Sequence, residues 1–271
     1  LSSGAGVTMS LVNTDGIGII PQNVEGLEAG ERIEVEILKP LAEIKHKLVS
    51  IGSHDLIMDI VADMMDLSSG HVGSMGGILA MRRGESHLAP IHLLDEASGD
   101  YNIPYIKRYF AGKEMALIKG VKRLQGFIVA KGNPSGIKGF QDLTREDLVF
   151  ANRQRGAGTR VLLDYYLKEK GLEAQDIRGY TRELTPHMAV ASAVKTGSAT
   201  TGLGILSAAR AMDLDFVEVA YEDYDFLVNY DILESEEMKK FVSILRSKDF
   251  QDKVKNLGGY NLEETGKIIK I

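Results

Sequence analysis

Residues 148–171, LVFANRQRGAGTRVLLDYYLKEKG, contain a strand, a tight turn and a helix in direct succession. The apolar run at 148–152 is typical of a buried strand, and two glycines lie in the turn that follows it. A helix is expected over 159–170, and Gly171 ends it. Because this order recurs along the chain, the sequence predicts an α/β fold with mostly parallel sheets and helices on both faces.

The same alternation extends from about residue 46 to the C-terminus. A helix is expected over 55–66, where Ile57, Val61 and Met64 share one face. Another is expected to run to Gly197, with Thr185 as N-cap and Pro186 in the first turn. We also expect helices at 75–83, 208–212 and 236–246, and strands at 47–51, 87–94, 115–130 (one or two strands), 177–180, 203–206, 216–219 and 226–228.

Residues 1–40 have a different character. They hold six acidic and two basic residues, so their net charge is −4, against −6 for the whole chain. The stretch 32–37 alternates strictly, which places Ile33, Val35 and Ile37 on one face of a strand. This short all-β segment is too small to fold well by itself.

The composition excludes several classes of protein. The 271 residues include no Cys, which rules out disulfides, thiolate zinc sites and iron–sulfur clusters. The excess of 38 acidic over 32 basic residues disfavours a broad nucleic-acid interface. No apolar run approaches the ~20 residues of a membrane helix. We therefore expect a globular protein with neither nucleic acid nor membrane as partner.

Three turns rich in glycine and small polar residues, at 52–55, 70–77 and 152–160, precede predicted helices. Free backbone N–H groups and hydroxyls at helix starts are typical of anion sites. Micromolar affinity needs about 8 kcal/mol, whereas one charge-assisted hydrogen bond contributes roughly 1.5–3 kcal/mol. An anion would therefore need donors from several of these turns at once.

Other site chemistries lack their motifs. The sequence has no phosphate loop, no dinucleotide-binding glycine motif and no H-E-x-x-H, so no direct cation ligands are expected. His54, His71 and His187 lie near turns, as ligand contacts or as capping and packing residues. His87 and His92 are interpreted as core histidines. For Arg153, Arg155 and Arg160 we keep open an anion site, a solvated surface, and ion pairs with Asp164 and Glu183.

Two family resemblances follow from longer motifs. Residues 1–38, with Asn13-Thr14-Asp15-Gly16 and Val24-Glu25-Gly26-Leu27, resemble the end of the C-terminal β-barrel domain of MoeA-type molybdopterin molybdenumtransferases. Residues 46–271 resemble the PBP-like (periplasmic-binding-protein-like) domain fused to such enzymes, with distant similarity to LysR-type substrate-binding domains and to molybdate- and tungstate-binding proteins. The motifs of this second resemblance are Gly52-Ser53-His54-Asp55, 70–77, His92-Leu93-Leu94-Asp95, Asn102-Ile103-Pro104, 152–160 and Gly202-Leu203-Gly204-Ile205.

The second resemblance implies a two-lobed type II periplasmic-binding-protein fold with two crossover strands. Lobe one would be about 46–128 plus 222–271, and lobe two about 129–221, with the ligand between them. No catalytic residue, metal ligand or required cofactor is expected. The ligand-binding residues expected on this basis are Ser53, His54, Ser74, Met75, Arg153, Gly156, Ala157, Gly158, Thr159, Arg160 and His187.

The implied function is that of a ligand-binding module in a cytoplasmic molybdenum cofactor biosynthesis protein. It would bind a small anion, with molybdate or tungstate favoured, and would itself be non-catalytic. The remainder of a MoeA-type enzyme is the expected partner, and residues 1–38 are expected to be disordered, to pack on the neighbouring lobe or to pair with another chain, as in a homodimer. Two alternatives stay open: a pterin-type ligand within the enzyme, and a structural or partner-binding appendage with a degenerate cleft.

Overall fold

The computed structural model describes residues 14–20, 23–28 and 30–271. It divides into two compact units, residues 1–47 and 48–271. In the first unit, β1 (Gly16–Ile19) pairs antiparallel with β2 (Glu34–Ile37), and the short helix α2 (Leu41–Lys45) follows. These strands confirm the predicted small β segment, whose residues 1–13 lie outside the described part of the chain. Asp15 accepts hydrogen bonds from Lys39 and Lys47, which links the two ends of the segment.

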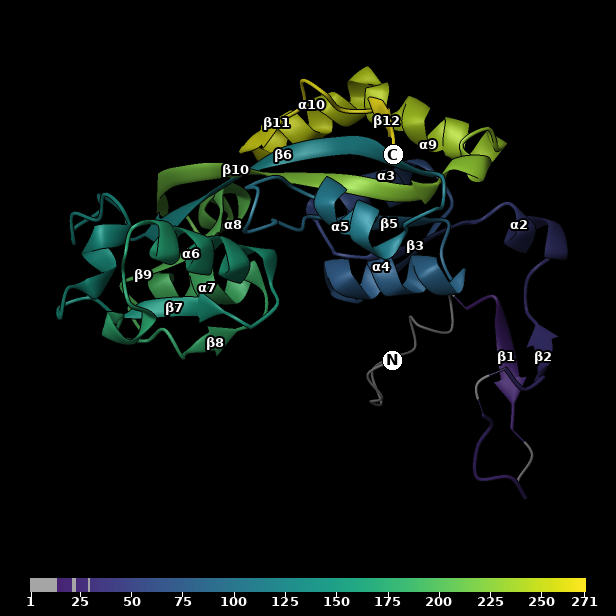
Figure 1. The fold of residues 1–271 in the computed structure, drawn as a ribbon, viewed down its shortest axis with the longest axis horizontal. Helices are drawn as coiled ribbons and strands as arrows, with labels where there is room; N and C mark the ends of the chain where they lie inside the picture. The colour runs from purple at the N-terminus through teal and green to yellow at the C-terminus, as the bar shows by residue number, and fades with distance from the viewer. Residues whose placement is uncertain (1–13, 21–22, 29) are drawn as a thin grey trace. The chain divides into compact units, whose positions relative to one another are not determined.

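The second unit is built on one curled mixed sheet with the strand order β4-β3-β5-β10-β6-β9-β7-β8. Figure 1 shows the unit as two lobes joined by two long strands, β6 and β10. The first lobe contains the parallel strands β3, β4 and β5, and the second contains the parallel strands β7, β8 and β9. This architecture confirms the predicted α/β fold with two crossover strands.

The first lobe alternates strands and helices, as the sequence predicts, and the C-terminal segment returns to it. Its elements are β3 (Leu48–Gly52), α3 (Leu56–Met64), β4 (Leu67–His71), α4 (Gly73–Arg83), β5 (Leu88–Ile91) and α5 (Ile103–Tyr109). The returning elements are the 3₁₀ turn η3 (Tyr230–Ile232), α9 (Glu236–Arg246), α10 (Lys248–Leu257), β11 (Tyr260–Asn261) and β12 (Ile268–Lys270).

The second lobe repeats the pattern between the two long strands. Its elements are η1 (Phe140–Thr144), β7 (Phe150–Arg153), α6 (Gly158–Glu169), η2 (Ala174–Asp176), β8 (Glu183–Leu184), α7 (His187–Lys195), β9 (Thr201–Ile205) and α8 (Leu206–Ala211).

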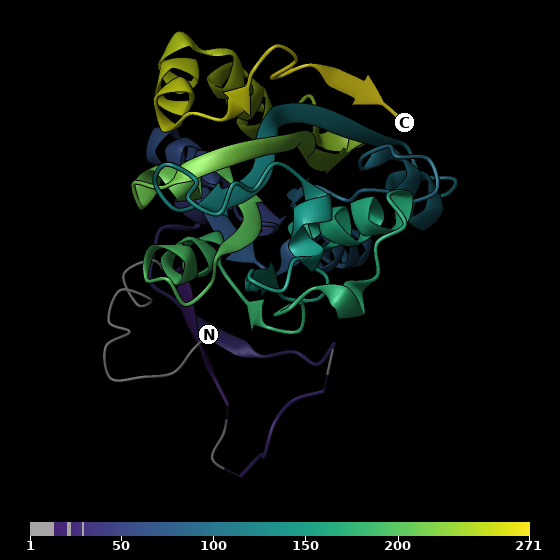
Figure 2. The same ribbon diagram turned by 90° about the vertical axis from the view of Figure 1, so that its left-hand side faces the viewer.

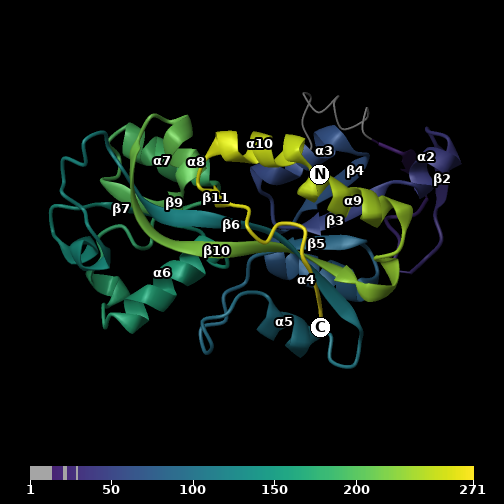
Figure 3. The same ribbon diagram turned by 90° about the horizontal axis from the view of Figure 1, so that it is seen from above.

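The sheet is covered on both faces in each lobe, as the alternation of its buried side chains shows. In the first lobe, Leu88 packs with α3, α9 and α10, while its neighbour Ala89 packs with α4 and α5. In the second lobe, Phe150 packs with α6, and Ala151 packs with α7 and α8. Figure 3 shows α6 and α7 on opposite sides of the second lobe's strands. Successive residues of a strand point to opposite faces, so a strand covered on both faces must be apolar throughout.

The strands β6 (Met115–Val129) and β10 (Asp215–Asn229) carry the sheet from one lobe to the other. They pair antiparallel along nearly their whole length, and Figure 2 shows them curving together. At one end β10 pairs with β5, and at the other end β6 pairs with β9. Between these ends, residues 121–124 of β6 face 221–224 of β10. These middle residues therefore lie between the lobes, and a ligand that contacts them would lie there too.

Several sequence-based element predictions are wrong. No strand forms over 177–180, which is a turn, and the helix expected from Thr185 begins at His187 without a side-chain cap. The two strands expected at 216–219 and 226–228 are parts of the single strand β10. Its charged residues interrupt the apolar pattern because they form buried ion pairs, which a pattern of hydrophobic residues does not reveal.

Candidate functional site

A cavity of about 470 Å³ lies where the parallel strands of both lobes end. The loops after β3, β4 and β5 contribute one wall, and the loop between β7 and α6 contributes the opposite wall. Ligand sites in open α/β sheets lie at these carboxyl ends of strands. We call it the polar cavity; its lining includes Ser53, His54, His71, Ser74, His92, Arg123, Arg153, Gly156, Ala157, Gly158, Thr159 and His187.

The fold brings together nine of the eleven ligand-binding residues expected from the sequence. Met75 and Arg160 are not part of the lining. Met75 packs against the core between α4 and the sheet. Arg160 forms ion pairs with Asp164 (3.0 Å) and Glu183 (3.5 Å), and its guanidinium stacks 4.1 Å from the Tyr180 ring centroid. These contacts are those that the ion-pair interpretation of Arg160 expects.

Arg123 of β6 forms the centre of a buried ion-pair network on the cavity floor. Its guanidinium donates to Asp55 Oδ2 at 2.8 Å and to Glu222 of β10. All three side chains are at most 2% exposed. Burial lowers the pKa of Arg123, but the two carboxylates outweigh burial and hold its pKa above the ordinary value. A buried charge needs such partners, because leaving it unpaired costs several kcal/mol.

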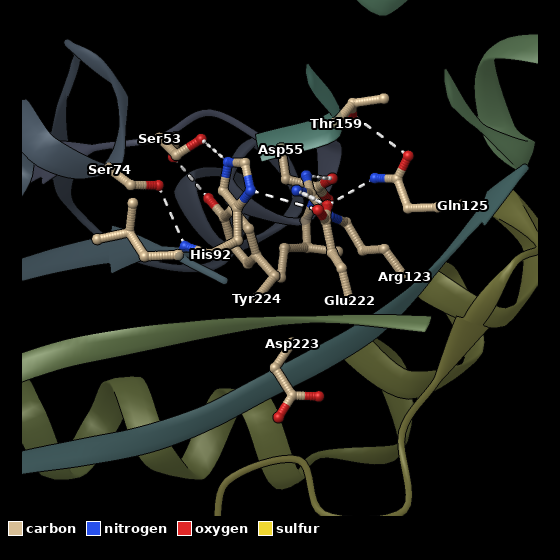
Figure 4. Close-up of polar contacts among 12 residues, drawn as sticks. Ser53, Asp55, Ser74, His92, Arg123, Gln125, Thr159, Glu222, Asp223 and Tyr224 are labelled. Atoms are coloured by element: carbon tan, nitrogen blue, oxygen red, sulfur yellow. Dashed lines mark hydrogen bonds and ion pairs between the residues drawn. The ribbon is translucent and has the colours of Figure 1, made fainter. Parts of the chain in front are cut away.

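Glu222 connects this network to the second lobe. Its Oε1 accepts a hydrogen bond from Gln125 at 2.7 Å, and Gln125 in turn accepts one from Thr159 at 3.3 Å. Burial raises the pKa of Glu222, but Arg123 and His92 outweigh burial and hold it well below the usual range. Figure 4 shows Glu222 and Tyr224 on one side of β10 and Asp223 on the other, as strand alternation requires.

His92, at the end of β5, lines the polar cavity and is not the core histidine expected from the sequence. Its Nε2 lies 2.8 Å from Ser53 Oγ, and its Nδ1 lies 3.4 Å from Glu222 Oε2 (Figure 4). Its backbone N–H donates to Ser74 Oγ at 3.1 Å. His87, at the other end of β5, is exposed and accepts a hydrogen bond from the Val49 N–H.

Arg153, at the end of β7, is a buried cation without an acidic partner. The side chain is 9% exposed, and no carboxylate among the described residues forms an ion pair with it. Its Nε has no hydrogen-bond partner there, and Nη1 donates to the Leu184 carbonyl at 3.4 Å. Burial, followed by the charge of Arg123, lowers the pKa of Arg153 to about 10. An anion in the cavity would relieve both effects.

The helix α6 begins at the edge of the cavity with no side-chain cap. Its first residue, Gly158, approaches His92 so closely that a Cβ there would lie 2.2 Å from Nδ1. The absence of a side chain at Gly158 therefore allows the two lobes to meet at this point. The free N–H groups of the first turn supply further donors near the cavity.

The histidines of the cavity do not assemble a metal site. His54 and His71 stack edge to face, with ring centroids 4.5 Å apart, and His54 contacts Asp59 at 3.2 Å. Burial and the charge of His54 lower the pKa of His71. Among the residues described by the structure, no group of three or more His, Asp or Glu side chains is arranged to hold a metal ion.

A second cavity of about 510 Å³ adjoins the polar cavity, and the two share residues including Ser53, Arg153 and His187. We call it the apolar cavity, because its other walls carry mostly hydrophobic side chains. These are Leu56, Pro186, Met188, Ile205, Ala208 and Ala211. Because the two cavities share these residues, a ligand in one of them would lie next to the other.

Sequence reasoning missed Arg123, Gln125 and Glu222. The signal was present, because Arg123 and Gln125 interrupt a long apolar strand. Their role depends on the pairing of β6 with β10, which places residue 123 opposite residue 222 across about 100 residues of sequence.

Comparison of the sequence with known proteins shows which families match this chain. Residues 61–246 match the PBP superfamily domain, and residues 1–38 match the MoeA C-terminal region (domain IV). The uncharacterized protein YvgK of Bacillus subtilis is 36% identical over 228 residues, which cover 82% of this chain and 73% of that protein. No helix among the described residues is long and apolar enough to cross a membrane.

Solved structures share the fold at low sequence identity. One described as a phosphate ABC transporter substrate-binding protein from Clostridium perfringens, with bound phosphate, has a TM-score of 0.56 at 17% identity, covering 78% of this chain and 97% of that one. The tungstate ABC transporter structure from Geobacter sulfurreducens has a TM-score of 0.55 at 12% identity, covering 78% and 99%. A substrate-binding domain from Clostridium difficile, described as belonging to a molybdenum ABC transporter, has a TM-score of 0.52 at 18% identity, covering 79% and 97%. Because the PBP superfamily domain model matches residues 61–246, more than half of the chain, the chain belongs to this family.

Proposed function

We propose that the second unit binds a small oxyanion in the polar cavity between its lobes. The observation that carries this proposal is Arg153, a buried guanidinium that lines the cavity and has no carboxylate partner within the described part of the chain. Buried cations are stable when paired, so the missing partner points to an anionic ligand. The hydroxyls of Ser53 and Ser74 and the start of α6 add neutral donors around the same space.

Molybdate or tungstate is the favoured ligand. The fold likeness to tungstate and molybdenum transport proteins and the MoeA match at residues 1–38 support this choice, while the likeness to a phosphate-binding protein makes phosphate the main competitor. In this proposal the module serves molybdenum cofactor biosynthesis in the cytoplasm, and the rest of a MoeA-type enzyme is its partner.

Isothermal titration calorimetry with molybdate, tungstate, sulfate and phosphate tests the proposal. Arg153→Gln is expected to weaken binding by about 1.5–3 kcal/mol, because one charge-assisted contact is lost. Arg178→Gln is the matched control in the same lobe: the residue is exposed and lies outside the lining of both cavities, so we expect affinity to change by less than about 0.5 kcal/mol.

Two results would contradict the proposal. One is an Arg153→Gln variant that folds and binds as tightly as the parent. The other is a parent protein that binds none of the four anions at millimolar concentration.

The apolar cavity favours a second candidate, an organic anion such as a pterin-type ligand. A small oxyanion would leave the hydrophobic walls formed by Leu56, Pro186 and Met188 uncovered, whereas a planar organic group would bury them. Met188→Asn is expected to weaken binding of such a ligand and to leave tungstate affinity within twofold, because the change adds no charge to the cavity that shares Arg153. Titration of the parent and this variant with a pterin phosphate and with tungstate distinguishes the two candidates.

A further inference from the structure

We propose that Gln125 and Thr159 form a positioning pair for anion binding. In this pair Thr159 uses its hydroxyl to anchor the start of α6 and offers the anion only its backbone N–H. The inference rests on the proposed function, because it concerns how the same cavity holds its donors in place. It starts from a line of hydrogen bonds that runs from Glu222 on β10 through Gln125 on β6 to Thr159 on α6 (Figure 4).

The buried ion pair on the cavity floor fixes the orientation of the Gln125 amide. Glu222 is a carboxylate paired with Arg123, so its Oε1 only accepts, and Gln125 turns its amide nitrogen toward it at 2.7 Å. The amide oxygen therefore points the other way, toward Thr159. Gln125 is completely buried, and β6 is paired on both sides at this position, with β10 and with β9. The acceptor that faces Thr159 is thus held firmly in place.

Thr159 has a single hydroxyl hydrogen, and the protein already uses it. Its Oγ1 donates to Gln125 Oε1 at 3.3 Å, and the residue is 2% exposed. Ser74 differs, because its Oγ accepts the His92 N–H at 3.1 Å and no described residue accepts its hydrogen. Of these two hydroxyls, Ser74 is therefore free to donate to an anion, and Thr159 is not.

The start of α6 needs an anchor of this kind. The helix follows the turn Gly156-Ala157-Gly158 and has no side-chain cap. Glycine restricts the backbone least, so the turn by itself fixes the direction of the free N–H groups only weakly. The hydrogen bond from Thr159 to Gln125 ties this first turn to the strand pair, and Gln125 lies outside the lining of both cavities. Gln125 is therefore a positioning residue, since it acts on the anion only through Thr159.

A double-mutant cycle with tungstate tests the pair. Thr159→Val and Gln125→Met each remove the bond between the two residues with little change in size, and each is expected to weaken binding about two- to tenfold. The double variant is expected to bind no more than about twofold more weakly than the weaker single variant, because all three lack the same contact. Thr159→Ser keeps the hydroxyl and is expected to recover most of the affinity lost in Thr159→Val.

Thr201→Val is the matched control for the loss of a buried hydroxyl. Thr201 is fully buried in β9 of the same lobe, donates to the Ile128 carbonyl at 2.9 Å and lies outside the lining of both cavities. Its stability is expected to fall as it does in Thr159→Val, because each variant loses one buried hydrogen bond, while tungstate affinity stays within about twofold of the parent protein.

Hydrogen exchange in the protein without ligand provides a second measurement. Loss of the anchor is expected to speed exchange of the backbone N–H groups in the first turns of α6, in both Thr159→Val and Gln125→Met, and to leave exchange in α7 unchanged. Thr159→Ser and Thr201→Val are expected to retain the exchange of the parent protein in α6.

Two outcomes would overturn the inference. One is a loss of affinity in Thr159→Val that is as large with Gln125→Met present as without it, which is expected if the Thr159 hydroxyl donates directly to the anion. The other is unchanged exchange at the start of α6 in Thr159→Val. Either result leaves the proposed function intact where the parent protein binds tungstate and Arg153→Gln weakens that binding. If no oxyanion binds, the proposed function fails and this inference fails with it.

Discussion

At the scale of single residues, Arg123 and Arg153 show how surroundings decide the role of a charge. Both guanidiniums are buried and line the polar cavity. Arg123 is paired with Asp55 and Glu222, so its charge is already compensated and its pKa lies above the ordinary value. Arg153 lacks such a partner among the described residues, and its pKa is lowered to about 10. Arg123 therefore organises the cavity floor, and Arg153 is the residue expected to contact the anion.

His187 makes the stability of the folded protein depend on pH. Burial, followed by the charge of Arg153, holds its pKa well below the ordinary 6.5. The unfolded chain takes up a proton on His187 below about pH 6.5, and the folded protein does not. The stabilisation is therefore complete above pH 6.5 and is lost as the pH falls below it, by up to about 1.4 kcal/mol per unit.

We expect His187→Gln to flatten this dependence. Urea denaturation of the parent and the variant between pH 5 and 7.5, without ligand, measures the difference in slope. Parallel curves for the two proteins would show that His187 does not contribute.

At the scale of elements, the two long strands separate two polar clusters onto opposite faces. On one face Glu222 joins Arg123 beneath the polar cavity. On the other, Lys119 lies 2.7 Å from Asp223 and 2.9 Å from Asp225. On β10 the two-residue period places Glu222 on one face and Asp223 and Asp225 on the other. On β6 the register shift between Ile118 and Val121 places Lys119 and Arg123 on different faces. Each cluster joins a side chain of β6 to side chains of β10. The two strands are therefore held together by side-chain contacts on both faces where the lobes meet.

The start of α6 leaves no space for a side chain at residue 158. In Gly158→Ala the new Cβ would lie 2.2 Å from His92 Nδ1, so the imidazole or the helix must move. We expect this substitution to cost about 1–3 kcal/mol of stability and to weaken anion binding. Gly139→Ala is the control, because its backbone is extended and its nearest neighbour, Gln141 Oε1, lies 3.5 Å away. Thermal denaturation and tungstate titration compare the two, and equal behaviour would contradict the prediction.

At the scale of the whole molecule, the second unit places donors on two lobes that are joined by a strand pair. The two joined cavities, of about 470 and 510 Å³, are much larger than a tetrahedral oxyanion. Ser53 and Ser74 lie on the first lobe, and Arg153 and Thr159 on the second. A small anion that contacts both sets connects the two lobes, so we expect binding to be coupled to a closing movement of the lobes.

Distance measurements between spin labels test this closure. The chain has no cysteine, so labels can be introduced at Arg82→Cys on α4 and Glu169→Cys on α6, both exposed. Saturating tungstate is expected to shorten the distance in the otherwise native protein and to leave it unchanged when Arg153→Gln is added. An unchanged distance in the presence of bound tungstate would show that the lobes do not close.

The sequence by itself determined the α/β alternation, because helices and strands bury their apolar residues with different periods. It also located the loops after β3, β4 and β7, since glycine and small polar residues mark strand-to-helix turns. The tertiary structure decided which of these loop residues face the cavity. It placed Arg160 in an ion pair with Asp164 and His92 in the lining of the polar cavity. It also decided the partnership of Arg123 with Glu222, because a buried charge is stable only beside a partner that strand pairing brings from a distant part of the chain.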